Sequence, residues 1–535
     1  MKYGFNSVLH SILHSKIMYG IIPKLRNIVE GVIYMELAAF ILYFVIVMCV
    51  GIFFFLRSRK ASGEKEYFLG GRSMGPWVTA MSAQASDMSG WLLMGLPGSI
   101  LAFGLGEAWI GIGLAIGTAA NWILVAKRLR RFSKAANDSI TLPQYLSNRF
   151  ATKGRGLQII CAVIFLVFFT VYVASSFVAG ATVFSTVMPE LSESAALIIF
   201  ALILLAYTFL GGYRAVCWTD FIQGIMMLVA LLAVPIVIVV TKNLDFSTLD
   251  TAYTYVENGN ETVYNFNSNL FGSDWRDIVS GLAWGLGYFG MPHILVRFMS
   301  IKKSSMVKKS ATVAIIWVVL SLGAAIIVAV FGRILIGEEL LTQGMQKLVF
   351  IKLARMLFPA FVAGLLMAAV IAAAMSTADS QLLVASSSFT SDIYKPVFRK
   401  NASDKETMWV GRLTVLVVAI VAYFIASSKG SGAQAIMNMV ENAWAGFGSA
   451  FGPVVILSLF WKRMTYKGAV AGVVAGAVVD VAWMLFLSAS TGIYELLPGF
   501  VAGFIACVIV TLIDKSPSKE VTDIYETAMS GSSDE

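Results

Sequence analysis

The sequence predicts an all-α protein that crosses a membrane many times, and three observations support this fold class. First, 58% of the 535 residues are hydrophobic and only 13% are charged, about half the charged fraction of a typical soluble domain. Second, the apolar residues form continuous runs of about 20 residues, the length of a membrane-spanning helix, rather than the shorter alternating segments of a β-barrel. Third, clusters of Lys and Arg separate these runs, as in the loops of membrane proteins.

We expect about thirteen transmembrane helices. The expected spans cover residues 36–56, 74–102, 107–126, 157–183, 193–209, 218–241, 276–296, 311–335, 357–386, 408–427, 436–460, 468–488 and 495–513. Basic clusters follow the first, third, seventh, ninth and eleventh spans, and positive loops stay in the cytoplasm. The first span therefore begins outside, and the C-terminus lies inside. The longest external loop, 242–275, forms either a small cap or a disordered loop.

The N-terminal stretch 1–34 disagrees with this orientation. It places Lys2, Lys16, Lys24 and Arg26 on the outer side, and it has no apolar segment typical of a signal peptide. Met35 directly precedes the first span. We expect translation to start naturally at Met35, so that residues 1–34 are a start-site artefact, residues 35–514 form the membrane domain and residues 515–535 form a solvated cytoplasmic tail.

Composition excludes several classes of protein. The net charge of +9 reflects cytoplasmic loops and does not indicate nucleic-acid binding. The four Cys lie in or beside apolar runs without a CxxC motif, which predicts buried thiols rather than a disulfide framework or metal site. Only three His are present, so a hydrolytic or metal-dependent enzyme has almost nothing to be built from. A channel would need rings of charge or carbonyls in an oligomer, and a solute sensor would need an attached output domain.

The second span carries the most informative residues. Ser86, Asp87, Ser89 and Gly90 interrupt a segment that is otherwise apolar. A carboxylate at membrane depth is costly, and Gly weakens the helix beside it. A chain tolerates both where a helix is broken to line a polar cavity, and unwound carbonyls there can coordinate a hard cation. The structural alternative is an intramembrane Asp that only joins helices.

The ninth and seventh spans carry further candidates. Ala373, Ser376 and Thr377 share one helical face and offer one carbonyl and two hydroxyls to a cation, although such hydroxyls usually bond to the preceding turn. In the seventh span, three Gly and Pro292 predict a broken helix. Trp284 and Tyr288 lie four residues apart and can wall a pocket, or form an aromatic belt at the membrane interface.

Two interrupted spans five helices apart indicate inverted repeats with a site at the membrane midplane. The motifs resemble the sodium:solute symporter family from about Met35 to about Ser516. The resemblance is carried by GGRS at 70–73, SDMSGWLLMGLPG at 86–98, WTD at 218–220, WGLGYFG at 284–290, MST at 375–377 and AWAGFG at 443–448.

The resemblance implies the leucine-transporter-type fold with a five-plus-five inverted repeat. Residues 74–241 would form repeat one and 276–460 repeat two, with 36–56 and 468–513 as peripheral helices. Carried over by motif, the Na⁺ ligands would be the carbonyls of Ala85, Met88 and Ala373 and the hydroxyls of Ser376 and Thr377. Asp87 matches an acid tied to Na⁺ dependence, and Asp220 an acid that in some relatives contributes to a second Na⁺ site.

Within the family, the chain is most similar to the bacterial proline carriers. The matching substrate positions are Ser89, Gly90, Tyr172, Trp284, Tyr288 and Pro292, and Arg72 matches an Arg that affects coupling. The resemblance implies Na⁺-coupled uptake of L-proline across the bacterial cytoplasmic membrane, without nucleic acid, enzymatic activity or an obligate protein partner. The alternative is another small solute, such as a different amino acid, a carboxylate, a sugar or a vitamin.

The sequence departs from the family pattern at two positions. Met291 stands where the family pattern leads us to expect Gln, next to Pro292. Asp379 is an additional acid close to Ser376 and Thr377. It is either part of a second Na⁺ site or a structural partner of a hydroxyl.

Overall fold

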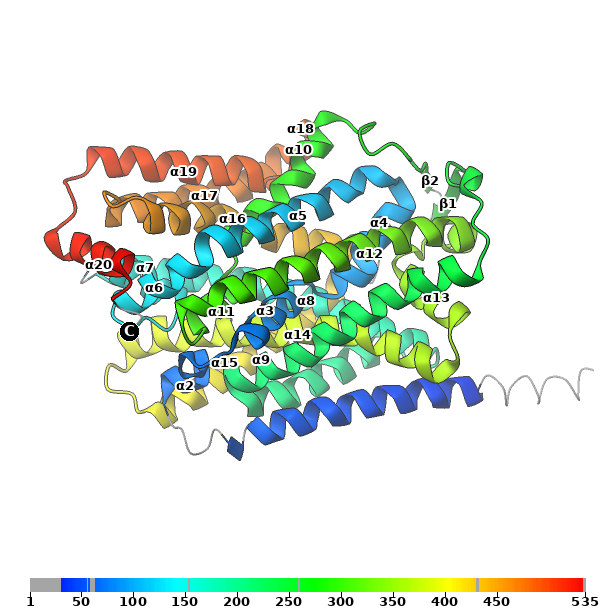
Figure 1. The fold of residues 1–535 in the computed structure, drawn as a ribbon, viewed down its shortest axis with the longest axis horizontal. Coiled ribbons are helices and arrows are strands. Elements are labelled where there is room, and N and C mark those ends of the chain that lie inside the picture. The colour runs from blue at the N-terminus through cyan, green and yellow to red at the C-terminus, as the bar shows by residue number, and fades with distance from the viewer. Residues whose placement is uncertain are drawn as a thin grey trace, which may run out of the picture.

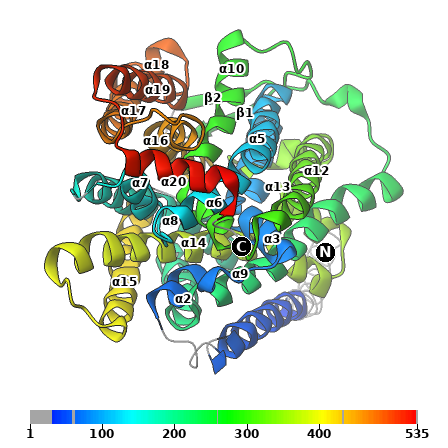
Figure 2. The same ribbon diagram turned by 60° about the vertical axis from the view of Figure 1, so that its left-hand side comes forward.

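The computed structural model describes residues 30–54, 56–57, 63–152, 154–257, 260–429 and 433–532. Most of the predicted extension 1–34 lies outside these residues. The described chain is a bundle of helices whose axes run roughly side by side (Figure 1). The first helix, Glu30–Phe54, lies at one edge of this bundle, and α17 and α19 lie at the opposite edge (Figures 1 and 2).

The helices after the first fall into two halves separated by a short hairpin. The first half contains α2 (Glu64–Leu69), α3 (Pro76–Asp87), α4 (Leu96–Phe103), α5 (Ala108–Ala120), α6 (Lys127–Ala135), α7 (Leu142–Arg149), α8 (Gly156–Val187) and α9 (Glu193–Thr241). The second half contains α10 (Trp275–Ala283), α11 (Pro292–Ser300), α12 (Val307–Leu341), α13 (Val349–Leu357), α14 (Ala360–Ser387), α15 (Asp404–Lys429), α16 (Ala433–Phe460), α17 (Tyr466–Phe486), α18 (Ser488–Thr491), α19 (Leu496–Ile513) and α20 (Lys519–Ser530).

Several segments depart from α-helical geometry. Wider π-helical turns cover Trp91–Gly95, Asn121–Ala126 and Ser388–Phe398. Tighter 3₁₀ turns cover Gly70–Arg72, Leu105–Glu107, Phe246–Thr248, Trp284–Phe289, Ser304–Met306 and Gln346–Leu348. Such turns inside a helix often mark functional positions, and those at Trp91–Gly95 and Trp284–Phe289 coincide with the two spans that the sequence predicts to be broken.

The number of spans depends on how the broken helices are counted. Among the described residues, 10 helices are long and apolar enough to cross a membrane, or up to 11 if the bent pair Trp275–Phe289 and Pro292–Ser300 is one span. The predicted thirteen also include 74–102 and 193–209. There the apolar helices Trp91–Phe103 and Glu193–Ala206 are shorter, because the chain breaks after Asp87 and at Gly212, where φ is 62°.

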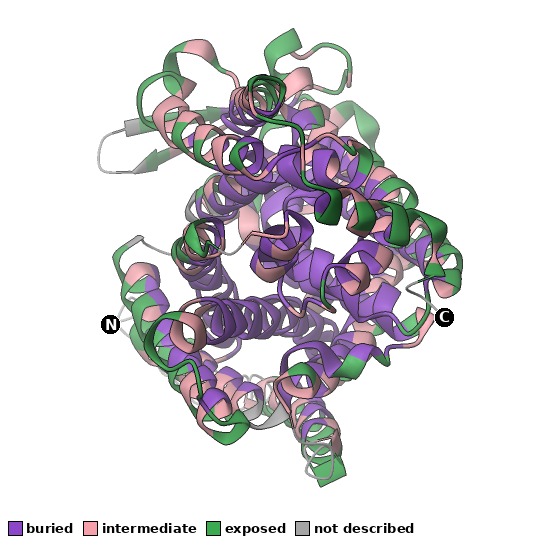
Figure 3. Cartoon of the chain, turned by 90° about the vertical axis from the view of Figure 1, so that its left-hand side faces the viewer, coloured by how far each residue is buried: buried purple, intermediate pink, exposed green. Residues whose placement is uncertain are grey.

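The core lies along α14 and α16. Viewed along the helix axes, buried residues fill the centre of the bundle and exposed residues lie outside (Figure 3). Many exposed side chains on the outside are large and apolar, for example Leu202, Val229 and Val239. Lipid is a suitable solvent for such side chains, whereas a soluble protein rarely exposes contiguous apolar surface of this kind.

Residues 253–264 contain the strands β1 (Tyr253–Glu257) and β2 (Asn260–Tyr264), paired antiparallel with Tyr253 opposite Tyr264. Arg333 of α12 donates hydrogen bonds to the carbonyls of Tyr264 (3.2 Å) and Leu101 (2.9 Å). Of the two predictions for the loop 242–275, the small cap is the one observed.

The prediction of a solvated tail is wrong for residues 519–530, which form α20. Val521 and Ala528 are buried. Arg149 donates a 3.1 Å hydrogen bond to the Val521 carbonyl, and Phe132 packs edge-on against Tyr525. Apolar residues spaced three or four apart form one face of a short helix, a pattern that the surrounding Ser, Asp and Glu residues conceal.

The cysteine prediction is correct at three positions and wrong at one. Cys161, Cys217 and Cys507 are buried free thiols, whereas Cys49 is exposed. Cys49 lies in the first helix, at the edge of the bundle. A thiol behaves as a small hydrophobe and is as compatible with lipid as with the protein interior.

Candidate functional site

The candidate site is built around the end of α3. The helix ends at Asp87, and Met88 has non-helical backbone angles (φ −83°, ψ 74°). The Ser89 amide bonds to the Asp87 carbonyl (3.0 Å) rather than to the Ala85 carbonyl four residues back. The Ala85 carbonyl is therefore released from the helical ladder.

Ser376 of α14 reaches this released carbonyl. Its hydroxyl lies 2.8 Å from the Ala85 oxygen and 3.2 Å from the Ala373 oxygen. The Thr377 hydroxyl, on the same helix, is buried without a hydrogen-bond partner. Buried hydroxyls usually have a partner, so the Thr377 hydroxyl, which has none among the described residues, is available to a cation. The structure thus brings together oxygens of Ala85, Ala373 and Ser376, all within a buried environment.

Asp87 connects the break after α3 to the second broken span. Its carboxylate accepts a 2.5 Å hydrogen bond from the Tyr288 hydroxyl, and both side chains are buried. The Tyr172 phenol of α8 lies close to Ser89 and Asp87. Two of the predicted substrate positions, Tyr172 and Tyr288, therefore lie beside the same carboxylate, and a third, Ser89, lies beside Tyr172.

The second broken span consists of α10, the 3₁₀ turns Trp284–Phe289 and α11, and its two halves are bent by 43°. Pro292 begins α11 and has no N–H to donate, which suits the first position of a helix. Asn121 donates a 3.0 Å hydrogen bond to the Tyr288 carbonyl, and Trp444 donates a 2.8 Å bond to the Trp284 carbonyl. These side chains replace helical hydrogen bonds that the break removes.

Aromatic rings cover one side of the site. Trp284 stacks with Trp91 and with Tyr494, with ring centroids 5.8 Å and 5.2 Å apart. The Tyr494 hydroxyl donates a 2.8 Å hydrogen bond to the Glu441 carbonyl and so ties the stack to α16. The stack can shield an apolar ring from water while the broken backbone supplies polar groups.

Gly90 allows α8 to approach the break. A Cβ atom built at Gly90 would lie 2.5 Å from the Ala179 Cβ, far inside van der Waals contact. Gly90 has ordinary αR angles (φ −51°), so the constraint is space rather than backbone strain. A side chain here would push α8 away from Ser89.

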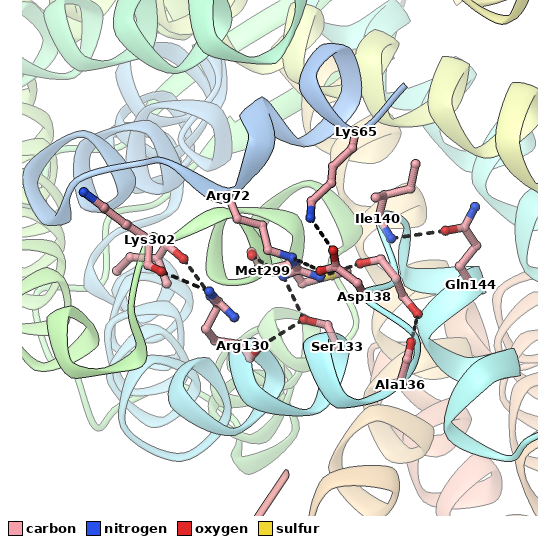
Figure 4. Close-up of polar contacts among 12 residues, drawn as sticks. Lys65, Arg72, Arg130, Ser133, Ala136, Asp138, Ile140, Gln144, Met299 and Lys302 are labelled. Carbon is pink, nitrogen blue, oxygen red and sulfur yellow. Dashed lines mark hydrogen bonds and ion pairs between the residues drawn. The ribbon is translucent and has the colours of Figure 1, made fainter. Parts of the chain in front are cut away.

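Arg72 lies at the centre of a second cluster of polar contacts (Figure 4). Its guanidinium donates to the Asp138 carboxylate (2.8 Å), the Ser139 carbonyl (2.7 Å) and the Met299 carbonyl at the end of α11. Lys65 also pairs with Asp138. We call this set of contacts around Arg72 and Asp138 the inner gate, because it joins the segments before α3, after α6 and after α11.

Charges within the inner gate support one another. Burial and then the charge of Arg130 lower the pKa of Arg72 to about 10, while Asp138 opposes that shift. Burial alone would raise the pKa of Asp138, but Lys65 and Arg72 together lower it. Both groups are therefore charged at neutral pH.

Asp220 lies in a separate ion pair. Arg297 of α11 approaches its carboxylate to 3.1 Å, and Ser82 donates a 2.6 Å hydrogen bond to the same oxygen. Arg297 also donates to Ser380 of α14. This pair joins α3, α9, α11 and α14 beside the site.

Several residues at the site were not predicted individually. Trp91 and Trp444 lie within the quoted motifs. Their aromatic side chains in those motifs could have identified them from the sequence. The sequence contains no comparable signal for Asp138, Asn121 or Tyr494, since their partners are far away in the chain. No described contact joins Met88 to the Ser376 hydroxyl, so its predicted role stays a prediction.

Comparison with known proteins assigns the family. A model of the sodium:solute symporter family matches residues 67–476. The chain belongs to the sodium:solute symporter family. The high-affinity proline transporter PutP of Bacillus subtilis is 43% identical to the symporter over 474 residues, which cover 87% of this chain and 96% of that protein. The sodium/proline symporter of Escherichia coli is 43% identical over 468 residues, covering 87% and 91%.

Solved structures agree on the fold. A Na⁺-coupled sialic acid symporter, in a substrate-bound outward-open state, has a TM-score of 0.68 and 20% identity and covers 91% of this chain and 99% of its own. Mhp1, a nucleobase-cation-symport-1 family transporter, has a TM-score of 0.52 and 15% identity, covering 86% and 98%. The symporter has the leucine-transporter-type fold. It is a multi-pass plasma-membrane transporter and not an enzyme.

Proposed function

We propose that this symporter couples the uptake of L-proline to the inward Na⁺ gradient across the cytoplasmic membrane. The observation that carries the coupling is the contact of Ser376 with the released Ala85 carbonyl, because it joins α14 to the break in α3 through cation-ligating oxygens. Na⁺ is the coupling ion, with Ala85, Met88, Ala373, Ser376 and Thr377 as its ligands. The choice of proline is supported by relatives named for proline transport that match about nine-tenths of the chain.

Proline binding follows from the same geometry. Trp284, Tyr288, Tyr172 and Pro292 provide apolar surfaces for the pyrrolidine ring, and all four are buried. Ser89 and Gly90 lie where the broken helix exposes polar backbone, which suits the charged amine and carboxylate of an amino acid. Because ion and solute share the break, Na⁺ tightens proline binding, and proline tightens Na⁺ binding by the same factor.

The driving force and the direction of transport follow from membrane physics. Each charge that moves down the potential contributes about 2.3 kcal/mol per 100 mV. The repeats 74–241 and 276–460 then move relative to each other, and opening of the inner gate releases both ligands to the cytoplasm. The first helix begins outside and the C-terminus lies inside, in accord with the basic loops beside the inner gate.

The decisive experiment is uptake of radiolabelled L-proline into proteoliposomes that contain only this protein. We expect accumulation with an inward Na⁺ gradient and none when N-methylglucamine replaces Na⁺. Accumulation without Na⁺ would contradict the coupling. Failure to accumulate proline, with Na⁺-dependent uptake of another solute, would contradict the substrate and leave the symporter class intact. Impermeant thiol labelling of single Cys residues placed in loops 242–275 and 302–309 would test the orientation.

A further inference from the structure

A buried carboxylate lies far from the Na⁺ site described above. Asp392 belongs to the π-helical segment Ser388–Phe398 that continues α14, and it is fully buried. It lies 16 residues beyond Ser376, roughly 24 Å along the helix. Within the described part of the chain, no Lys, Arg or His forms an ion pair with it, and Glu64, whose charge acts on it, is also acidic.

The contacts of Asp392 fit an ionised carboxylate. Oδ1 accepts two hydrogen bonds, one from Thr141 Oγ1 at 2.9 Å and one from Gln158 Nε2 at 2.7 Å. The Gln144 amide donates to Thr141 Oγ1, so the Thr141 hydroxyl proton is available for Asp392. Two donors on one oxygen favour the charged form, whereas burial of the carboxylate opposes it.

The other oxygen of Asp392 has no protein partner. Oδ2 is buried and unpaired among the described residues, and so is the hydroxyl of Ser388. Ser388 lies four residues before Asp392, and its hydroxyl is near enough to the carboxylate to interact with it weakly, although no hydrogen bond of ordinary geometry joins the two. A buried charge without a countercharge is costly, and nearby Lys395 is already paired with Glu64. These groups lack a cation.

We propose that Asp392 Oδ2 and Ser388 Oγ bind a second Na⁺, separate from the ion between α3 and α14. Carboxylate and hydroxyl oxygens are the donors that hard cations prefer. The site also adjoins the inner gate, because Thr141 and Ser139 belong to one loop and the Ser139 carbonyl accepts a hydrogen bond from Arg72. An ion at Asp392 therefore contacts the same loop that Arg72 holds through Ser139.

Equilibrium binding of ²²Na⁺ to the purified full-length protein tests this site at constant ionic strength. We expect two Na⁺ per wild-type protein and one in Asp392→Asn. The double variant Ser376→Ala, Thr377→Ala should retain the Asp392 site, which separates this inference from the proposed coupling site. Asp404→Asn is the matched control, since Asp404 is exposed at the start of α15.

A second variant, Ser388→Ala, tests the same site with a smaller change to the buried side chains. Ser388→Ala keeps the carboxylate and removes one ligand, and it should weaken only the second site, by about tenfold. Unchanged Na⁺ binding in both Asp392→Asn and Ser388→Ala would overturn the proposal and would indicate that Asp392 carries a proton instead. Loss of one Na⁺ in Asp392→Asn but not in Asp404→Asn, with unaltered thermal unfolding, would establish it.

Discussion

Asp87 is the residue at which the two broken spans meet. Its carboxylate accepts the Tyr288 hydroxyl at 2.5 Å, so a charge after α3 holds a ring that precedes α11. A buried carboxylate with few donors gains more from a nearby cation than an exposed one does. We therefore expect Asp87 to contribute to coupling through its charge and not only through its shape.

Asp87→Asn should abolish Na⁺-driven uptake without removing the protein from the membrane, since Asn keeps the shape and an acceptor for Tyr288 but loses the negative charge. Proteoliposome uptake at several Na⁺ concentrations, with immunoblots of membrane content, measures the effect. The control is Asp277→Asn, at an exposed position of α10. Normal Na⁺-dependent uptake by Asp87→Asn would refute the role assigned to its charge.

Trp284→Ala should weaken proline binding at least about fivefold, because truncating a buried aromatic anchor typically costs more than 1 kcal/mol, and should affect Na⁺ binding less. Trp284 stacks between Trp91 and Tyr494, whereas Trp275 of the adjoining helix is 59% exposed and supplies the control Trp275→Ala. Calorimetric titration with each ligand measures both affinities. Equal loss of both would indicate collapse of the site instead of a damaged pocket.

At the scale of elements, the break in the second span depends on close packing against α8. The gap between Gly90 and Ala179 has no room for a methyl group. Tight interiors respond to an added methyl by shifting backbone, at a cost of about 1 to 3 kcal/mol. The geometry of Ser89 and Tyr172 therefore rests on the absence of a side chain at position 90.

Gly90→Ala should lower the unfolding temperature and reduce proline uptake, because the new methyl displaces α8 from the break. Gly75→Ala is the matched control: Gly75 lies at the start of α3, has φ −77°, and a Cβ there meets nothing within 4 Å. Thermal unfolding and uptake of the two variants are compared. Equal behaviour would show that α8 tolerates the shift.

Elements also show the limits of reading segments one at a time. The tail was predicted as solvated, yet α20 docks on Arg149 and Phe132. Neighbouring helices decide this outcome, since they supply the partners that a short segment lacks. The predicted division of α9 into 193–209 and 218–241, by contrast, agrees with the break at Gly212.

At the scale of the whole molecule, the contacts of the inner gate are all formed in this structure. Arg72 joins three segments that are far apart in the chain, and Arg130 donates to the Ile301 carbonyl at 2.6 Å beside it. Alternating access requires these contacts to break when the cytoplasmic side opens. The Asp138 carboxylate is 40% exposed, so water screens its ion pairs and each contributes modestly.

Asp138→Asn should therefore shift the population toward an open inner gate by a few-fold. A Cys introduced at buried Ser300, in a background without native Cys, reports this as faster labelling by an impermeant maleimide from the cytoplasmic side. Asp404→Asn is the charge control.

The pH dependence of the inner gate follows from the pKa of Asp138, which is lowered in the folded protein. The stabilisation that its carboxylate contributes is full above its unfolded pKa of about 4 and is lost only as pH falls through the lower folded pKa. The rate at which the parent is labelled, divided by the rate for a free thiol at the same pH, should be constant from about pH 6 to pH 8. An unchanged rate in Asp138→Asn would contradict the gate.

The sequence by itself determined the class of fold, the positions of the two breaks and the family. Hydropathy reflects the solvent that surrounds a helix. Gly, Pro and Asp inside an apolar run interrupt the helical backbone locally, whichever helices pack against it. Only the tertiary structure decided which groups meet: Ser376 with Ala85, Tyr288 with Asp87, Arg72 with Met299. These partners are 291, 201 and 227 residues apart, and contacts at such separations arise from the packing of whole helices, which no local pattern specifies.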